Sequence, residues 1–211
     1  MGQKESIHHH ILLYGQSGHG KTNFLYDNFL NGKWEEEQKK VESSLGYNFE
    51  LITTLQDQNY GVWDISGHPE FIDMQDLFLK TIPFTGIMYI IRPKYHLGSL
   101  VEDKLKEIGQ ARQQIFYLTN HKNFTNKFIL IVLNIEEEQL TASGDGDVSA
   151  ETLELLIDEI KELIKYDQIQ VQQKGIIIMD RGFSYTKLWE KVGSLIQGVK
   201  AIEKKKDQQK D

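Results

Sequence analysis

The sequence predicts an α/β protein built on a mainly parallel sheet. Two observations carry this prediction: the apolar runs are short and partly β-branched, and helix-length segments separate them. The length of 211 residues suits one globular domain, with or without a tail. A composition of 39% hydrophobic and 26% charged residues is typical of a chain that can bury a core.

The expected elements follow from these runs in order. Strands are predicted over His8–Tyr14, Tyr47–Thr54, Tyr60–Asp64, Gly86–Ile91, Phe128–Leu133 and Gly175–Met179. The second and third of them read as a hairpin around a polar break. Helices are predicted from about Lys21, over Val101–Leu118, after an N-cap at Ser149, and along the apolar stripe Leu188–Val199. Residues 200–211 are nearly all Lys, Glu, Asp and Gln, so we expect the last helix to fray there into a solvated tail.

Charge and composition exclude several classes of protein. With 24 basic and 31 acidic residues the net charge is −7, which argues against nucleic-acid binding by general electrostatics. The absence of cysteine excludes disulfides, iron–sulfur clusters and a cysteine nucleophile. No apolar run approaches the ~20 residues of a membrane span, and the N-terminus has no signal-peptide pattern. We therefore expect a protein of the cytosol or a connected space.

One segment matches the phosphate-binding pattern G-x-x-x-x-G-K-[ST] in full. It reads Gly15, Gln16, Ser17, Gly18, His19, Gly20, Lys21 and Thr22, with an apolar strand before it and a helix after it. Glycines let the backbone wrap a phosphate chain, and amide groups at the helix start, which includes Asn23, face the anion. Lys21 would reach the β- and γ-phosphates, and Thr22 would hold Mg²⁺. The alternative is a glycine-rich strand–helix turn without a ligand.

A second motif narrows the class of nucleotide-binding protein. Trp63-Asp64-Ile65-Ser66-Gly67 ends a strand with D-x-x-G, in which the Asp contacts Mg²⁺ through water and the Gly amide can bond the γ-phosphate. Upstream of the predicted hairpin stands the run Ser43-Ser44-Leu45-Gly46-Tyr47-Asn48-Phe49-Glu50. With these motifs the sequence resembles the Arf branch of the small GTPases, which carries P-T-I-G-F-N-V-E before the hairpin and W-D-x-G-G-Q after it. The resemblance spans roughly residues 8–199 and is strongest in the first 70 or so.

The resemblance implies a fold and a set of ligands. The fold is that of a small GTPase, a six-stranded, mostly parallel sheet with one antiparallel hairpin strand and helices on both faces, here over residues 1–199. The ligands are GTP or GDP with Mg²⁺. Two segments, near 34–47 and 67–80, would act as switches that order around the γ-phosphate. The metal ligands carried over are Thr22, Asp64 and Ser44, which keeps the hydroxyl of the family's Thr.

The expected hydrolytic residue departs from the family. His68 stands where the family has a Gln that orients the attacking water. One interpretation is a slow or partner-assisted GTP hydrolase in which His68 still orients water. The other is an inactive position in which His68 is an ordinary polar residue.

The expected base-reading residues are altered as well. Asn134-Ile135-Glu136-Glu137 follows a strand where the family has N-K-x-D, so Asn134 is kept and Glu137 replaces the Asp that binds guanine. Met179 stands where the family offers a backbone N–H to the base. Guanine selectivity is then an open question, and the alternative is a solvated, Glu-rich loop.

The first residues match M-G-x-x-x-[ST], the pattern for N-myristoylation of Gly2. Because the pattern is short, a chance match is the alternative. A membrane would be a partner only if Gly2 is acylated.

Three hypotheses of function remain. The first is an Arf-like GTP-binding switch with slow or absent intrinsic hydrolysis that acts through protein effectors. The second is a pseudo-GTPase that serves as a structural subunit of a larger assembly. The third is a P-loop protein for ATP or another nucleotide. Relatives in the Arf branch serve vesicle transport, cilia and the cytoskeleton, and the sequence does not choose among these locations.

Overall fold

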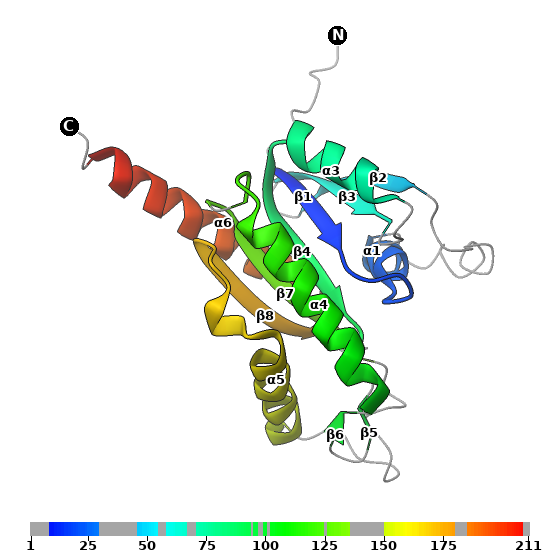
Figure 1. The fold of residues 1–211 in the computed structure, drawn as a ribbon. Helices are drawn as coiled ribbons and strands as arrows, with labels where there is room; N and C mark the ends of the chain where they lie inside the picture. The colour runs from blue at the N-terminus through cyan, green and yellow to red at the C-terminus, as the bar shows by residue number, and fades with distance from the viewer. Residues whose placement is uncertain are drawn as a thin grey trace.

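The alternating apolar runs and helical segments fold as a layered α/β structure (Figure 1). The structure is a computed structural model that describes residues 9–29, 46–54, 58–66, 71–93, 95–96, 99–100, 102–124, 126–135, 150–179 and 185–208. The main sheet contains β1 (His9–Tyr14), β2 (Tyr47–Thr53), β3 (Asn59–Ile65), β4 (Phe84–Ile91), β7 (Phe128–Asn134) and β8 (Gln173–Met179). The helices are α1 (Lys21–Phe29), α3 (Ile72–Thr81), α4 (Glu102–Asn120), α5 (Ala150–Ile164) and α6 (Tyr185–Gln208). A short ladder of β5 (Tyr95–His96) and β6 (Ser99–Leu100) and a 3-10 helix, η3 (Tyr166–Gln168), complete the described elements.

The main sheet is mostly parallel, as the sequence predicts. Its six strands lie in the order β2-β3-β1-β4-β7-β8. Only the β2–β3 pair is antiparallel among the described ladders of this sheet, and it is the hairpin expected from the sequence. The crossovers on either side of β1 make its carboxyl end a topological switch point, the place where open α/β sheets bind ligands.

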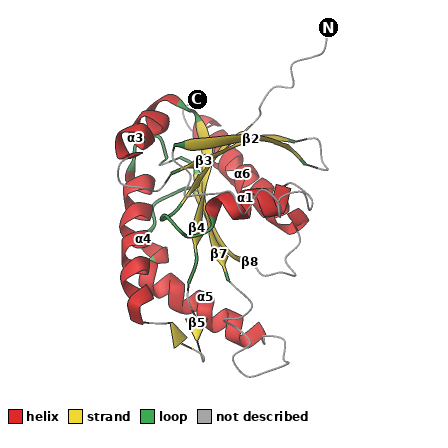
Figure 2. Cartoon of the chain, turned by 90° about the vertical axis from the view of Figure 1, so that its right-hand side faces the viewer, coloured by secondary structure: helices red, strands yellow, loops and turns green. Residues whose placement is uncertain are grey.

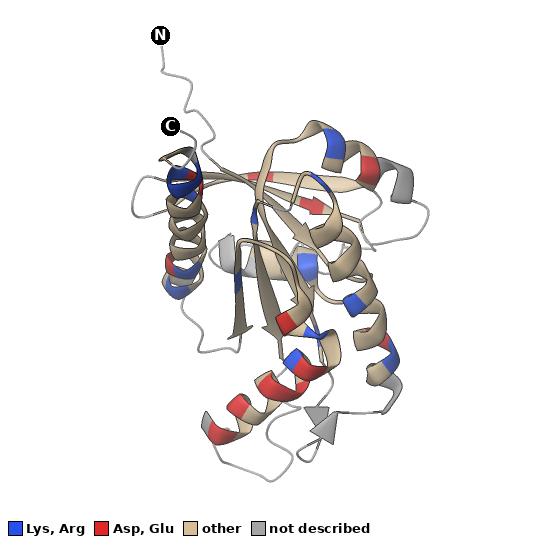
Figure 3. Cartoon of the chain, turned by 60° about the vertical axis from the view of Figure 1, so that its left-hand side comes forward, with Lys and Arg blue, Asp and Glu red and all other residues tan. Residues whose placement is uncertain are grey.

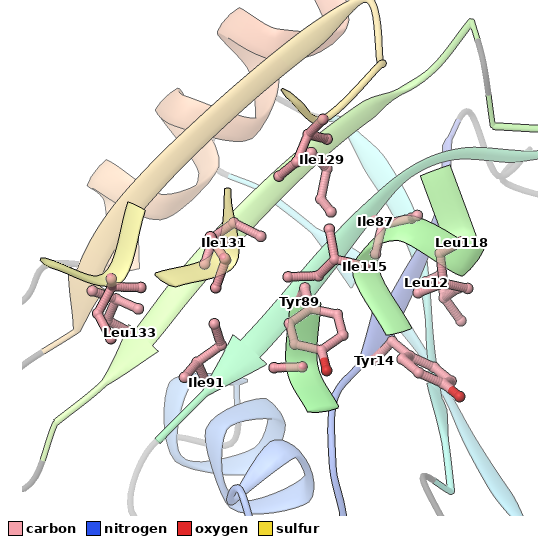
Figure 4. Packing of buried hydrophobic residues seen from close by; sticks show 14 of the residues in the cluster. Leu12, Tyr14, Ile87, Tyr89, Ile91, Ile115, Leu118, Ile129, Ile131 and Leu133 are labelled. Atoms are coloured by element: carbon pink, nitrogen blue, oxygen red, sulfur yellow. The ribbon is translucent and has the colours of Figure 1, made fainter. Parts of the chain in front are cut away.

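Helices cover both faces of the sheet (Figure 2). Odd-numbered residues of β7 contribute Ile129, Ile131 and Leu133 to a cluster with α4 and α5 (Figure 4), whereas even-numbered ones contribute Phe128, Leu130 and Val132 to a cluster with α1 and α6. Because side chains alternate along a strand, a central strand between two helical layers is apolar throughout. The burial of β7 on both faces therefore accounts for its unbroken apolar run.

Helix α6 differs from its prediction at its C-terminal end. The apolar stripe expected along it is buried: Leu188, Val192, Leu195, Ile196 and Val199. The charged segment after Val199 does not fray, however, and the helix continues to Gln208 beyond the sheet (Figure 1). Lys, Glu and Gln are good helix formers, and the packed turns before them supply the nucleus, so the helix can propagate in solvent. The expected boundary at residue 200 therefore falls inside a helix.

Helix α3 and the short elements β5, β6 and η3 are absent from the sequence prediction. The buried positions of α3 include Gln75 and Leu79, one turn apart. A polar residue at one of them hides the apolar periodicity by which a helix is recognised. The elements β5 and β6 have two residues each, too few to show any period.

Charge is unevenly distributed over the helices. Helix α5 has an acidic outer surface (Figure 3), formed by Glu151, Glu154, Asp158, Glu159 and Glu162. None of the helices in the described part of the chain is long and apolar enough to cross a membrane.

Candidate functional site

The predicted site residues within the described ranges lie along the carboxyl edge of the sheet. Gly15 follows β1 directly, and Asp64 lies near the end of β3, where Leu13 is its register partner. Asn134 and Met179 end the neighbouring strands β7 and β8 and are paired in register. Parallel strands bring these positions together although they are far apart in the chain.

The segment Gly15–Gly20, here called the glycine-rich loop, turns sharply between β1 and α1. Gly15, Gly18 and Gly20 have φ angles of 149°, 80° and 74°, which side-chain-bearing residues rarely adopt. A Cβ atom at Gly15 would lie 2.5 Å from the carbonyl oxygen of Ile90. The glycine at this position is therefore required by its conformation and by the close approach of β4.

The side chain of Lys21 forms hydrogen bonds to the backbone of the glycine-rich loop. Its Nζ donates to the carbonyl oxygens of Gly15 and Gln16, each at 3.0 Å. The side chain is 8% exposed. Burial lowers the pKa of Lys21, and the nearby Asp64 carboxylate opposes that shift. The ammonium group is thus held at the loop by weak neutral acceptors, which the charged oxygens of a phosphate would outcompete.

A hydroxyl and a carboxylate meet beside the loop. The Oγ1 atom of Thr22 donates to Oδ2 of Asp64 at 2.7 Å, and Nδ2 of Asn48 approaches the same oxygen at 3.5 Å. Asp64 is only 1% exposed. Hydroxyl and carboxylate oxygens are the ligands that Mg²⁺ prefers, so Thr22 and Asp64 fit such an ion. Ser44, the third expected metal ligand, lies outside the described residues.

The remaining loop residues differ in exposure. Ser17 and Gly18 are exposed at the tip, and Gln16 and Asn23 are half-buried. His19 is buried, with contacts to β4 and α4. The loop therefore presents only its outer part to solvent.

Of the residues expected to read the base, the structure describes Asn134, Ile135 and Met179. A Cβ atom at Gly20 would lie 3.1 Å from Nδ2 of Asn134, so this amide reaches the glycine-rich loop. Ile135 and Met179 are 5% and 6% exposed and belong to the hydrophobic core. Because its side chain points into the core, Met179 leaves its backbone as the part that can face a ligand. Ile135 likewise packs in the core.

Several predicted site residues fall outside the described ranges: Gly2, Ser44, Gly67, His68 and Glu137. The described residues bring together the glycine-rich loop, Lys21, Thr22, Asp64, Asn134 and Met179. Among the described residues, no group of three or more His, Cys, Asp or Glu side chains is arranged to hold a metal ion.

Sequence reasoning missed one polar residue that supports the site from α3. The Tyr14 hydroxyl, at the end of β1, donates to Oε1 of Gln75 in α3. The Nε2 group of Gln75 donates to the carbonyl oxygen of Ser66 at 2.7 Å. Gln75 is 6% exposed and joins two strand ends that flank the site. No sequence signal marks this residue, because its partners are brought to it only by the fold.

The comparisons with known proteins place the chain in no family. No protein-family model matches it, and no curated protein sequence matches it.

Proposed function

We propose that the chain is a guanine-nucleotide-binding switch with a small-GTPase fold that resembles the Arf branch. It binds GTP or GDP with Mg²⁺, hydrolyses GTP slowly or not at all, and acts through protein partners. The observation that carries the proposal is the contact of 2.7 Å between the Thr22 hydroxyl and the Asp64 carboxylate, next to a buried Lys21 inside a loop of three positive-φ glycines. The sheet order and the place of the loop at the switch point after β1 support it.

The residues of this site have separate tasks in binding. The glycine-rich loop offers its backbone N–H groups to the phosphates, and Lys21 exchanges its two carbonyl partners for phosphate oxygens. Thr22 and Asp64 hold the metal side of the site. When bound there, Mg²⁺ would neutralise charge on the phosphates. Asn134 and the backbone at Met179 lie at the far end, where the base would be read.

An exposed aromatic surface supports the proposal that the chain acts through protein partners. It consists of the exposed Tyr47 and Phe49 of β2 together with the half-buried Trp63 of β3 and Phe78 of α3. Phe49 and Trp63 have ring centroids 4.5 Å apart, and Tyr47 and Phe78 4.8 Å apart. Tyr47 and Phe49 are nevertheless 51% and 36% exposed. Clustered, exposed aromatic residues are typical of protein interfaces, and Trp63 directly precedes Asp64, so a partner there would lie next to the metal side of the site.

A second candidate is a pseudo-GTPase that serves as a structural subunit. It is favoured by the burial of Ile135 in the core, which leaves base recognition to Asn134, Glu137 and backbone groups. Phosphate binding and hydrolysis use different residues, so a chain can keep the first and lose the second.

The nucleotide content of protein purified without added nucleotide tests the proposal. The protein is denatured, and the supernatant is separated by chromatography against GDP, GTP, ADP and ATP standards. We expect close to one guanine nucleotide per chain, and retained GTP would indicate a stalled switch. If the purified protein contains ATP or ADP instead, it binds adenine nucleotides and the proposal of guanine specificity is wrong. A folded, empty protein that binds neither GTP nor ATP with Mg²⁺ would contradict nucleotide binding and favour the structural subunit.

A further inference from the structure

Helix α4 contacts the glycine-rich loop through Glu107. The Nε2 group of Gln16 donates to the backbone carbonyl oxygen of Glu107 at 2.6 Å. The Nε2 atom of His19 lies 3.4 Å from Oε2 of the Glu107 carboxylate. Two loop residues, one near each end of the turn, therefore meet the same residue of a helix that is about 90 positions away in the sequence.

The imidazole of His19 occupies a position that is unusual for a loop side chain. It is 5% exposed, and its Nδ1 atom lies 3.4 Å from the carbonyl oxygen of Ile90 in β4. The same carbonyl oxygen is the atom that approaches Gly15 most closely. The ring thus fills the space between β4 and α4 behind the loop, and its second nitrogen points toward Glu107.

The tautomer of His19 decides which contact is a full hydrogen bond. A neutral imidazole has one N–H, so it donates either to the Ile90 carbonyl or to the Glu107 carboxylate. Burial lowers the pKa of His19, and the ammonium of Lys21 acts in the same direction, while Glu107 and the Ile90 carbonyl oppose the shift. For the neutral ring, the bond to the charged carboxylate is the stronger of the two.

We propose that Glu107 is a positioning residue for the glycine-rich loop, which it holds in its curved shape through the His19 ring and the Gln16 amide. A loop with three positive-φ glycines has much conformational freedom to lose. Contacts that hold such a loop before a ligand arrives reduce the entropy lost on binding and so increase affinity. The effect on nucleotide affinity rests on the proposed function, whereas the effect on loop order does not.

The test compares Glu107→Ala with Glu107→Gln, and uses Gln110→Ala, an exposed position of the same helix, as the matched control. Two readouts are needed: hydrogen exchange of amides 15–20 in nucleotide-free protein, and the release rate of a fluorescent GDP analogue with Mg²⁺. Glu107→Ala removes the carboxylate contact to His19 but keeps the backbone carbonyl that accepts from Gln16. We therefore expect faster exchange in the loop and release about two- to tenfold faster, as for loss of one ordinary hydrogen bond. Glu107→Gln retains an oxygen that accepts from the His19 ring, so it should keep most of the wild-type values.

A double variant separates positioning from general destabilisation. If Glu107 acts through the His19 ring, adding Glu107→Ala to His19→Ala should change loop exchange little, because the ring that the carboxylate contacts is already gone. Wild-type exchange in Glu107→Ala would overturn the inference. So would equal effects of Glu107→Ala and Glu107→Gln accompanied by a common fall in melting temperature. If the wild-type protein binds no nucleotide, the proposed function is wrong, but the exchange measurement still decides the role of Glu107.

Discussion

At the residue scale, two buried charges define the candidate site. Lys21 is 8% exposed and Asp64 is 1% exposed. Burial of a charge is unfavourable unless polar groups compensate for the lost water. Two loop carbonyls accept from Lys21, and the Thr22 hydroxyl donates to Asp64. Apolar residues in these places would stabilise the fold as well or better, so we interpret the two charges as functional.

Replacement of Lys21 by alanine should remove most of the nucleotide affinity. The loss of an ammonium group that neutralises phosphate charge corresponds to about 3 kcal/mol, or roughly a hundredfold in Kd. The measurement is a titration of wild type and Lys21→Ala with a fluorescent GDP analogue in the presence of Mg²⁺. Lys187→Ala, at an exposed position on α6, is the control and should bind as wild type. Unchanged affinity in Lys21→Ala would mean that the loop does not hold the phosphates.

At the element scale, α3 is fixed to the sheet by a buried polar contact. Gln75 accepts from the Tyr14 hydroxyl and donates to the carbonyl oxygen of Ser66. Burial raises the pKa of Tyr14 to about 12, so its hydroxyl keeps its proton at neutral pH and needs an acceptor. These bonds tie the helix to the carboxyl ends of β1 and β3, next to the glycine-rich loop.

The variant Gln75→Met tests this attachment. Methionine has nearly the same volume but cannot accept from Tyr14, so the free energy of unfolding should fall by about 1–3 kcal/mol. Urea denaturation of the wild type and the variant measures the difference. Gln110→Met, on the exposed side of α4, should remain within about 0.5 kcal/mol of wild type. Equal stability of Gln75→Met and wild type would show that the buried bonds add little.

The packing of β4 against β7 depends on a glycine. A Cβ atom at Gly86 would lie 2.2 Å from the ring of Phe128, which is fully buried. Gly86→Ala should therefore destabilise the protein by about 1–3 kcal/mol through overpacking. Gly109→Ala is the opposite case, because nothing lies near its Cβ position in α4, and it should be stabilising by about 0.5–1 kcal/mol. Thermal unfolding of the two variants should shift in opposite directions, and a shift in the same direction would contradict this account of Gly86.

At the scale of the whole molecule, the proposed function assigns nucleotide binding and GTP hydrolysis to different residues. The proposed binding groups come from the glycine-rich loop and the ends of β3, β7 and β8, which the fold holds together. The residue expected to orient water, His68, belongs to a different segment. The aromatic surface of β2, β3 and α3 includes Trp63, which directly precedes Asp64, so a partner bound there would lie next to the proposed metal site.

Intrinsic GTP hydrolysis should therefore be slow. We expect a single-turnover rate of about 10⁻³ per second or less, the order of an unassisted switch GTPase. Phosphate release from preloaded GTP, with protein in excess, gives this rate. A rate of about 1 per second without any partner would contradict the proposal. If measurable hydrolysis is unchanged in His68→Ala, His68 does not orient the attacking water.

The sequence by itself determined the class of fold and the position of the phosphate-binding pattern. These predictions use local patterns: strands with apolar residues on both faces, helices with one apolar stripe, and glycines at fixed spacing. Each pattern depends only on residues that are a few positions apart in the chain. The central strand at Phe128, the hairpin from Tyr47 and the helix starting at Lys21 are where these patterns predict them. The differences from the prediction also have local causes. The polar Gln75 interrupts the apolar periodicity of α3, and the charged composition after Val199 is typical of a tail although α6 continues through it.

The tertiary structure alone decided which distant side chains meet. The pairs Thr22 with Asp64, Tyr14 with Gln75, and Gln16 with Glu107 are separated by 42, 61 and 91 residues. No periodicity links such positions, because their distance depends on strand order and on the way each helix packs across the sheet. It also decided that His19 is buried and that Ile135 and Met179 belong to the core. A sequence shows which groups can do chemistry, whereas their burial and partners arise only when the sheet and its two helical layers assemble.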